Sequence, residues 1–408
     1  MQRRDFLRHA GLAGLGAAVT TPLRAAETPA AVPVGDSPAV YAPTADGATV
    51  VLPVADFEAG WVEYGEAGTE GAPGTLVKGD GFGNIPHGDK VLRIRLTGLK
   101  PGTDYWYRVH TRAAIAKAVD PKTVPVKTGE VYRFRTLAPE ADGTRFCIWN
   151  DTHDHPPALA RLADMARAEP VDFLFWNGDV SNNVNREALF AGLYLQPRGV
   201  NLAKGPAILF TRGNHDVRGA QAYKLPGYIA YPENRPYYSF RTGPVGVIVL
   251  DTGEDKPDDH PSFLGRVDFA ALIREQAAWL AREIGKPHLK DAPYRVVLCH
   301  IPLRWTQETI PDYANGGYDH WSKRGRDAWH ASLVKWGAQL VISGHTHRHA
   351  HLPATGDFPY DQLVGGGPEL ERNTTLIRVA ADKSALTVRL IAAKSGEVIL
   401  AREYKPVG

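Results

Sequence analysis

Five short apolar segments of this chain each run directly into a motif built on aspartate, asparagine or histidine. The segments lie at residues 145–150, 172–177, 207–211, 295–299 and 339–343. Runs of this length that are rich in Val, Ile, Leu and Phe are typical of buried strands. The carboxyl ends of the strands in an α/β sheet are where ligand groups are presented. The chain is therefore expected to fold around a sheet whose carboxyl edge gathers several polar side chains.

The residues at these strand ends are the oxygen and nitrogen donors that suit Mn, Fe, Zn and similar ions. They form five motifs in order: Asp151-Thr152-His153, Gly178-Asp179, Gly213-Asn214-His215-Asp216, a single His300, and Gly344-His345-Thr346-His347. Each motif alone has an ordinary explanation, because a Gly-Asp pair is often a turn and a histidine-rich stretch is often simply solvated. Five motifs in order, each after a strand, predict a metal site instead. The number of donors suits two metal ions that share one ligand.

This order of motifs resembles the calcineurin-like metallophosphoesterase superfamily over residues 144–403. The resemblance implies a four-layer αββα sandwich of the α/β class that holds two metal ions, of Fe, Mn or Zn. The ligands that it implies for one metal are Asp151, His153, Asp179 and His347. The ligands that it implies for the other are Asp179, Asn214, His300 and His345. Asp179 would then bridge the two ions, and an anion between two cations offsets part of their repulsion.

The same resemblance implies a reaction and roles for nearby residues. The reaction is hydrolysis of a phosphate ester by attack of a metal hydroxide, with His215 as the general acid for the leaving alkoxide. Asp216, or another nearby carboxylate, is a candidate to orient the ring of His215. Asn182 and Asn183 are candidate donors to one phosphoryl oxygen, and Arg304 is a candidate cation for another.

Residues 36–137 predict a separate all-β module, because short alternating runs are divided by turns that contain Gly, Pro and Asp. In residues 96–105 a strand ends, turns and returns through Tyr105, which resembles the corner tyrosine of a fibronectin type III module. Residues 137–143 are the expected linker. A fibronectin-like module before a phosphoesterase domain is the layout of the purple acid phosphatases. In those proteins a tyrosine three residues after the bridging aspartate ligates iron, whereas Asn182 occupies that position here.

Helical periodicity of the apolar residues predicts helices at 157–168, 268–284 and 326–336. Residues 237–240 and 245–250 predict a hairpin, and only strands are expected after His347. The aromatic segment 305–321 shows no periodicity, so it either forms the wall of a leaving-group pocket or packs in the interior. Cys147 and Cys299 lie inside apolar runs and are expected to be buried thiols rather than a disulfide.

The first 25 residues predict a twin-arginine export signal. Arg3-Arg4-Asp5-Phe6-Leu7 precedes an apolar run of about ten residues, which is far short of the ~20 needed to span a bilayer. The expected location is therefore periplasmic or secreted, without a membrane span. The whole chain carries a net charge of +2, and residues 1–25 hold four arginines against one aspartate, or +3. The remaining −1 gives no electrostatic case for binding nucleic acid.

Three functional interpretations follow from these features. The first is an exported phosphomonoesterase that acts on a small phosphate ester. The alternative within the same chemistry is a phosphodiesterase for cyclic nucleotides or glycerophosphodiesters, because a diester carries one charge fewer and needs fewer cationic contacts. The alternative of another class is a non-catalytic exported protein that binds phosphate or metal. A complete ligand set with an adjacent acid argues against a purely structural site.

Overall fold

The computed structural model describes residues 37–79, 83–114, 120–305 and 317–407. These residues all belong to one compact unit, Val32–Gly408. The predictions for residues 1–25, and for Tyr313 and its neighbours at 306–316, fall outside the described residues. No helix in the described part of the chain combines the length and the apolar character needed to cross a bilayer.

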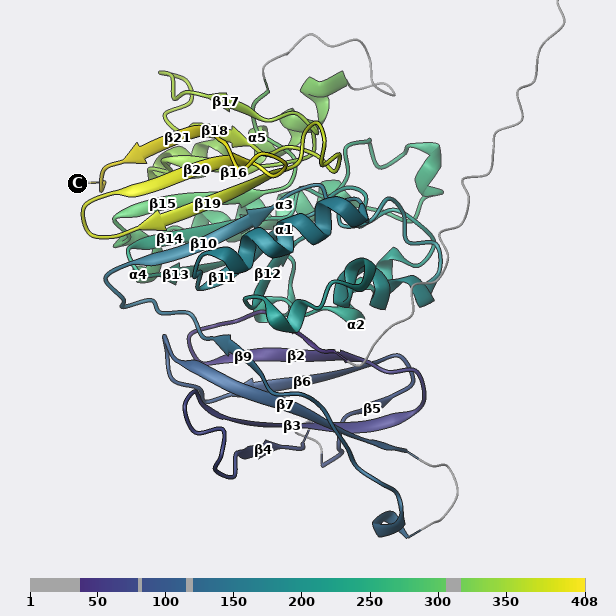
Figure 1. Ribbon diagram of the computed structural model, residues 1–408. Helices are drawn as coiled ribbons and strands as arrows, with labels where there is room; N and C mark the ends of the chain where they lie inside the picture. Colours follow the sequence, from purple (N-terminus) through teal and green to yellow (C-terminus); the bar gives the residue numbers. More distant parts are fainter. Residues whose placement is uncertain (1–36, 80–82, 115–119, 306–316, 408) are drawn as a thin grey trace, which may run out of the picture. The chain divides into compact units, whose positions relative to one another are not determined.

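Two sheets form the centre of the phosphoesterase-like region (Figure 1). The first contains, in order, β21 (Val398–Tyr404), β20 (Leu386–Ala392), β19 (Thr375–Ala381), β10 (Thr144–Trp149), β11 (Phe173–Asn177) and β12 (Ile208–Thr211). The second contains β13 (Tyr238–Thr242), β14 (Val245–Leu250), β15 (Tyr294–Cys299), β16 (Leu340–Ser343), β18 (Asp361–Val364) and β17 (Ala350–Leu352). Strands β10, β11 and β12 run parallel, as do β14, β15, β16 and β18. Parallel pairing brings the carboxyl ends of the motif-bearing strands to one edge of each sheet.

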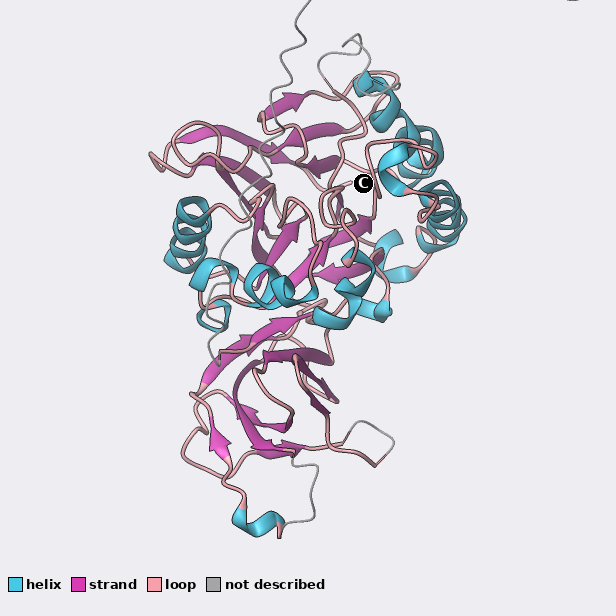
Figure 2. Cartoon of the chain, turned by 90° about the vertical axis from the view of Figure 1, so that its right-hand side faces the viewer, coloured by secondary structure: helices cyan, strands magenta, loops and turns pink. Residues whose placement is uncertain are grey.

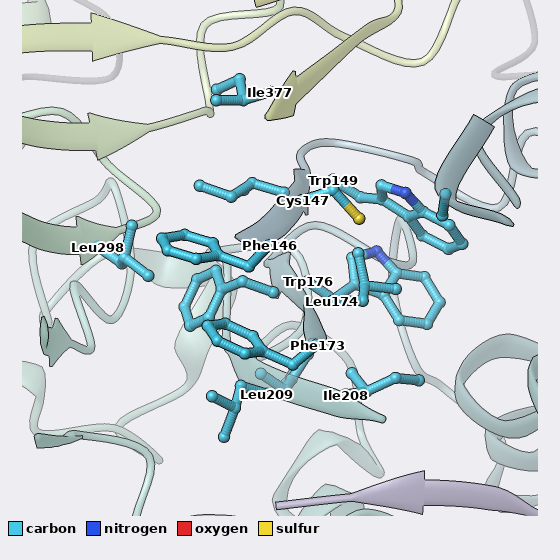
Figure 3. Close-up of a cluster of buried hydrophobic side chains, with 14 of the residues drawn as sticks. Phe146, Cys147, Trp149, Phe173, Leu174, Trp176, Ile208, Leu209, Leu298 and Ile377 are labelled. Carbon is cyan, nitrogen blue, oxygen red and sulfur yellow. The ribbon is translucent and has the colours of Figure 1, made fainter. Parts of the chain in front are cut away.

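The core between the sheets is built from alternate residues of their strands (Figure 3). Phe146 and Phe173 point from the first sheet toward Leu298 of the second. Cys147 and Leu174, one position further along each strand, point to the opposite side. Every residue of Phe146–Trp149 in β10 and of Phe173–Trp176 in β11 is buried, so these stretches are continuously apolar rather than alternating.

Helices cover the outer faces of both sheets (Figure 2). The helices are α1 (Pro156–Ala168), α2 (Leu225–Tyr228), α3 (Phe269–Glu283), α4 (Pro287–Lys290) and α5 (Gly317–Trp336). Short single-turn helices occur at η1 (Pro121–Thr123), η2 (Glu187–Leu189), η3 (Ala191–Leu195), η4 (Pro197–Gly199), η5 (Leu202–Lys204), η6 (Ala222–Lys224), η7 (Pro232–Asn234) and η8 (Pro261–Phe263). Helix α1 packs Leu159 and Leu162 into the core of the first sheet, and Leu280 of α3 and Leu333 of α5 cover the second. The predicted helix–sheet–sheet–helix sandwich is confirmed.

The N-terminal module is all-β, as expected, and consists of two sheets. One contains β1 (Ala39–Tyr41), β2 (Gly47–Pro53) and β6 (Val91–Thr97). The other contains β4 (Thr75–Val77), β3 (Glu58–Glu66), β7 (Asp104–Ala113) and β8 (Lys127–Thr128), with β5 (His87–Gly88) paired to β3 and β9 (Tyr132–Arg135) paired to β7. The hydroxyl of Tyr105 accepts a hydrogen bond from the backbone N–H of Lys100 at 2.9 Å, which is the contact expected of a corner tyrosine. Membership of the fibronectin type III class remains a prediction.

Two features of the fold were not predicted. Strand β1 pairs in parallel with β12 at Tyr41 and Ile208, so the first sheet of the module continues the first phosphoesterase sheet. Helix α5 begins at Gly317, nine residues before the predicted start at 326. Its first half lacks apolar periodicity and contains Gly325, so the sequence pattern did not mark it as helical.

Both cysteines are buried free thiols, as the sequence predicted.

Candidate metal centre

The five motif-bearing strands deliver the seven predicted ligands to one place. Asp151 follows β10, Asp179 follows β11, Asn214 follows β12, His300 follows β15 and His345 follows β16. His153 and His347 come two residues after the first and the last of these. Asp151, Asp179, Asn214 and His300 are buried almost completely, whereas the two histidines of the last motif remain partly exposed. The site is therefore an acidic and histidine-rich floor with one open side.

Four side chains converge on a first position. One ligand atom from each of Asp151, His153, Asp179 and His347 lies within 4.8 Å of all the others. The Nε2 atoms of His153 and His347 are 2.9 Å apart, and His347 Nε2 lies 3.6 Å from Asp151 Oδ1. The second carboxylate is close as well, because His153 Nε2 lies 3.4 Å from Asp179 Oδ2.

A second position shares Asp179 with the first. Ligand atoms of Asp179, His300 and His345 again lie within 4.8 Å of one another. His300 Nε2 is 3.2 Å from Asp179 Oδ2, the oxygen that also faces His153. Asn214 joins this group through its Oδ1 atom, which lies 2.8 Å from Nδ1 of His345. The seven residues therefore form two groups with Asp179 in common.

The spacing and chemistry of these atoms fit metal ions. Ligands at about 2.0–2.2 Å from a metal lie at most about 4.4 Å from one another, close to the 4.8 Å within which each group converges. Nε2 of His300 is buried, lies close to Asp179 and yet makes no hydrogen bond. Two imidazole Nε2 atoms, those of His153 and His347, face each other at hydrogen-bond distance. A cation at each position would satisfy these nitrogen atoms.

The backbone at the site adopts an unfavourable conformation. Asp151, His153, Asp179, His345 and His347 all have positive φ angles, between 42° and 74°. This left-handed region is costly for residues other than glycine, by roughly 1–2 kcal/mol each. Strain of this kind persists where the surrounding structure enforces it and clusters at functional sites. All five residues with this backbone conformation belong to the two convergent ligand groups.

The charged groups of the site are arranged around buried carboxylates. Burial raises the pKa of Asp151 to about 7. Burial would also raise the pKa of Asp179, but His300 and His153 outweigh it and hold that pKa well below its usual range. Burial opposes protonation of His300, but Asp179 and Asp151 outweigh this effect and raise its pKa to about 10. In the absence of a cation, a proton on His300 therefore neutralises the shared carboxylate.

Two predicted histidine ligands make hydrogen bonds through Nδ1, the ring nitrogen that faces away from the metal positions. His300 Nδ1 donates to the backbone carbonyl of Asn177 at 2.8 Å, which leaves Nε2 to face the site. His153 Nδ1 lies 3.0 Å from Oδ1 of Asn182. Asn182, predicted as a substrate contact, therefore holds His153 through its side chain, and its backbone carbonyl contacts Nδ1 of His215 at 2.7 Å.

His215 lies against the first metal position, with its ring centroid 4.8 Å from that of His153. Nη1 of Arg218 is 3.0 Å from Nε2 of His215. An arginine can only donate and a carbonyl can only accept, so His215 is neutral with its proton on Nδ1. Burial lowers the pKa of His215, although Asp179 opposes this effect.

Asp216 does not orient His215, contrary to the prediction. Its Oδ1 accepts from the backbone N–H of Val180 at 3.0 Å and from the hydroxyl of Tyr194 at 2.7 Å. Its Oδ2 accepts from the backbone N–H of Gly213 at 2.8 Å. Asp216 is therefore a buried anchor that joins the loops after β11 and β12.

Arg304 is also placed differently from the prediction. Its Nη1 atom donates to the backbone carbonyls of Pro353 and Tyr360, at 3.2 and 3.3 Å, and its guanidinium stacks on the ring of Phe358. These contacts engage it with the segment between β17 and β18. Trp305 beside it is buried, which favours packing over a pocket wall for the described start of the aromatic segment.

A group of buried acids beside the centre was missed by sequence reasoning. Asp251, Glu254 and Asp255 follow β14 and are nearly inaccessible to solvent. Arg218 donates through Nε to Glu254 at 2.8 Å and through Nη2 to Asp255 at 2.6 Å, and Arg212 pairs with Asp251 at 2.7 Å. The signal was present, because these acids follow a sixth apolar run, but they match none of the five motifs.

Comparison with known proteins identifies the domain that contains this site. The model of the calcineurin-like phosphoesterase family matches residues 144–349, about half of the chain. Purple acid phosphatase 15 of Arabidopsis thaliana is 24% identical over 325 residues, which cover 72% of this chain and 56% of that protein. The human serine/threonine-protein phosphatase CPPED1 is 26% identical over 144 residues, which cover 35% of this chain and 42% of that protein. The chain thus spans about half the length of the curated relatives that it matches.

A solved structure shows the same fold. Purple acid phosphatase PPD1 from yellow lupin (Lupinus luteus) seeds superposes with a TM-score of 0.64 at 13% identity, covering 90% of this chain and 74% of that one. That alignment includes most of the N-terminal module as well as the two-sheet sandwich. With the family model matching from β10 to just beyond the last histidine motif, the chain belongs to the calcineurin-like phosphoesterase family of metal-dependent hydrolases.

Proposed function

We propose that this protein hydrolyses phosphate monoesters with two metal ions bound at the centre. The observation that carries the proposal is the pair of convergent ligand groups that share Asp179, with His215 against them. Asp151, His153, Asp179 and His347 would hold one ion, and Asp179, Asn214, His300 and His345 the other. Nitrogen and oxygen donors of this kind suit Fe, Mn or Zn. When bound, two such ions supply positive charge to the phosphoryl oxygens and make water a stronger nucleophile.

The positions of His215 and Arg218 indicate on which side of the metal positions the leaving group would lie. His215 and Arg218 lie together on one side of the metal positions, and Arg218 is held there by Glu254 and Asp255. We place the leaving group on this side, because a general acid must reach the oxygen that it protonates. An anionic substrate that accepts the Nη1–H bond of Arg218 would free Nε2 of His215 to take up a proton from solvent, while Nδ1 keeps the proton that it donates to the carbonyl of Asn182. The resulting imidazolium would donate the Nε2 proton to the departing oxygen and return to the neutral form.

The preference for a monoester rests on charge. Arg218 is a cation beside the site, and a monoester presents one more negative charge than a diester. The Nη1 atom of Arg304 is engaged by the backbone carbonyls of Pro353 and Tyr360, and a site without this cation would favour the diester alternative. The two substrates must therefore be compared directly.

The decisive experiment measures hydrolysis by metal-free protein and by protein reloaded with Mn²⁺, Zn²⁺ or iron. Matched substrates are 4-nitrophenyl phosphate and bis(4-nitrophenyl) phosphate. We expect metal-dependent turnover that is greater on the monoester and is lost in Asp179→Asn, whereas the exposed control Asp164→Asn keeps it. Greater turnover on the diester would favour the phosphodiesterase. Binding of phosphate and metal with no turnover of either ester would favour the non-catalytic alternative.

The role of His215 has its own test. His215→Ala should keep both metals and lose roughly 10²–10⁴-fold in kcat on alkyl esters, whose leaving groups need a proton. The loss should be much smaller on aryl esters. Equal losses on both kinds of ester would remove His215 from the acid role.

Export through the twin-arginine route is a further part of the proposal. It is supported by the paired Arg3 and Arg4 before a short apolar run. Replacing both arginines with lysine should leave the protein in the cytoplasmic fraction of a bacterial host. Equal recovery of the variant and the wild type outside the cytoplasm would contradict this route.

A further inference from the structure

A cavity of about 790 Å³ lies between the loop that follows β12 and the segment that leads into α3. Four cationic side chains contribute to its lining, those of Arg212, Arg218, Lys256 and Arg266, and Arg212 is paired with Asp251 at 2.7 Å. Phe269 and Leu272 of α3 contribute an apolar wall. A volume of this size is typical of a pocket for a small molecule.

The cavity opens beside the residues that we assign to the leaving group. Arg218 lines it and places Nη1 at 3.0 Å from Nε2 of His215. Asn183 lines it as well, next to Asn182, whose carbonyl holds Nδ1 of His215. The ring of His215 in turn lies 4.8 Å from that of His153 at the first metal position. A substrate with its phosphoryl group on the metals would therefore extend its alcohol half toward this cavity.

The cationic side chains differ in their freedom to bind an anion. Arg218 and Lys256 are paired with Asp255, at 2.6 and 2.7 Å, and this carboxylate does not line the cavity. Arg266 is exposed, and its Nε–H donates to the carbonyl of Phe263 at 3.1 Å. Its two terminal nitrogen atoms make no hydrogen bond or ion pair with any residue in the described ranges. The one carboxylate in the lining, Asp268, caps α3 by accepting from the N–H of Ala271.

We propose that this cavity is the leaving-group subsite, and that it selects esters whose alcohol half is an aromatic or apolar body with a second anionic group. The apolar body packs on Phe269 and Leu272, and the anion pairs with the guanidinium of Arg266. The inference rests on the proposed function, because it assigns the alcohol half of the substrate of that same centre. It goes further by naming the chemical class of that half.

The test compares phenyl phosphate with 4-carboxyphenyl phosphate on the metal-loaded protein. The wild type should prefer the carboxylate-bearing ester in kcat/KM, and Arg266→Gln should reduce that preference by roughly three- to tenfold. The variant should change kcat/KM for phenyl phosphate less than kcat/KM for 4-carboxyphenyl phosphate. Comparing the ratio between variants cancels the intrinsic reactivity of the two esters. Arg282→Gln is the matched control, because Arg282 is exposed near the end of α3 and does not line the cavity. A ratio that is the same in Arg266→Gln and in the wild type would overturn the inference.

A blocking variant tests the position of the subsite. Ala220 is exposed and lines the cavity, so Ala220→Trp should fill part of it without disturbing the core. This variant should lower kcat/KM for 1-naphthyl phosphate at least severalfold and leave methyl phosphate unaffected. Equal effects on the two esters would place the leaving group elsewhere and overturn the inference.

Binding of the alcohol alone separates the inference from the proposed reaction. Saturation-transfer NMR with 4-hydroxybenzoate should detect binding to the wild type and weaker binding to Arg266→Gln. If no ester is hydrolysed but this dependence on Arg266 is found, the proposed reaction fails and the anion-selective cavity stands. If esters are hydrolysed and 4-hydroxybenzoate binds equally to both proteins, the inference fails alone.

Discussion

Gly213 tests whether the shared aspartate must stay where the structure places it. A Cβ atom added at Gly213 would lie 2.1 Å from Oδ1 of Asp179 and 2.4 Å from its backbone nitrogen. Non-bonded carbon contacts are most favourable at about 3.5–4.0 Å, so the overlap exceeds about 1 Å. Rotation of the Asp179 side chain can relieve the first contact but not the second. Gly213→Ala must therefore move the backbone that carries Asp179.

The expected magnitude follows from this displacement. Overpacking at a site that cannot collapse costs about 1–3 kcal/mol. Metal–ligand distances tolerate only about 0.2 Å, so most of this cost should appear when the metals bind. At tenfold per 1.4 kcal/mol, the affinity for metal should fall by roughly 5- to 150-fold. Because Asp179 belongs to both ligand groups, both metals should be affected.

The assay is equilibrium dialysis against buffered Mn²⁺ or Zn²⁺, with the bound metal per chain measured by mass spectrometry. Gly356→Ala is the matched control, because a Cβ atom there meets no atom within 4 Å. Circular dichroism establishes that each variant is folded. A Gly213→Ala protein that binds two metals with wild-type affinity would refute the reasoning.

Three further predictions concern protonation, colour and the N-terminal module. Burial opposes protonation of His300, but Asp179 and Asp151 outweigh it and raise the pKa of His300 to about 10. A metal ion must therefore displace this proton in order to bind. The apparent affinity for metal, measured by calorimetry, should rise about tenfold per pH unit between pH 7 and 10. Below about pH 7 the affinity should depend more steeply on pH, because burial raises the pKa of Asp151 to about 7 and metal binding then displaces a second proton. An affinity that does not change with pH would contradict both protonation assignments. An iron-loaded sample should lack the intense visible band of iron–tyrosinate, because Asn182 stands at the tyrosine position, and finding that band would mean that another tyrosine ligates iron. Tyr105→Phe should lower the free energy of unfolding in urea by about 0.5–1.5 kcal/mol, since it removes the acceptor of the Lys100 N–H, with no change in metal content.

The parts of the fold that the sequence predicted are those with a strong local pattern. Strands β10 and β15 each contain a run of four buried apolar residues, Phe146–Trp149 and Val296–Cys299, and burial on both faces explains why the pattern is unambiguous. Helix α1 starts at Pro156, where the proline ring suits the first turn. The early start of α5 carries no such pattern. The pairing of β1 with β12 joins residues far apart in the chain, and no local periodicity encodes such a partner.

In the candidate site, too, the features with a local sequence pattern were predicted and those that depend on tertiary contacts were not. The motifs predicted which residues would lie together, because each follows a strand of known direction. The partners of single polar side chains were not predictable, since they depend on tertiary neighbours. Asp216 is a neighbour of His215 in the chain, yet its carboxylate binds the hydroxyl of Tyr194 and backbone N–H groups. Arg218, outside every motif, is the residue that contacts the ring of His215.

Asp216, whose role differs from the prediction, and the acids after β14, which were not predicted, together explain how the ligand atoms are kept in position for cations. Asp151 and Asp179 are buried beside each other with left-handed backbones, and neither feature is favourable in the absence of a counter-charge. Asp216 fixes the loops that carry two of the motifs, and the acids after β14 fix Arg218 at the edge of the site. The unfavourable burial and backbone conformation occur at the metal ligands themselves, and the favourable hydrogen bonds are made by residues that surround the ligands. Such an arrangement keeps the donor atoms converged before any ion arrives, so binding energy is not spent on ordering them.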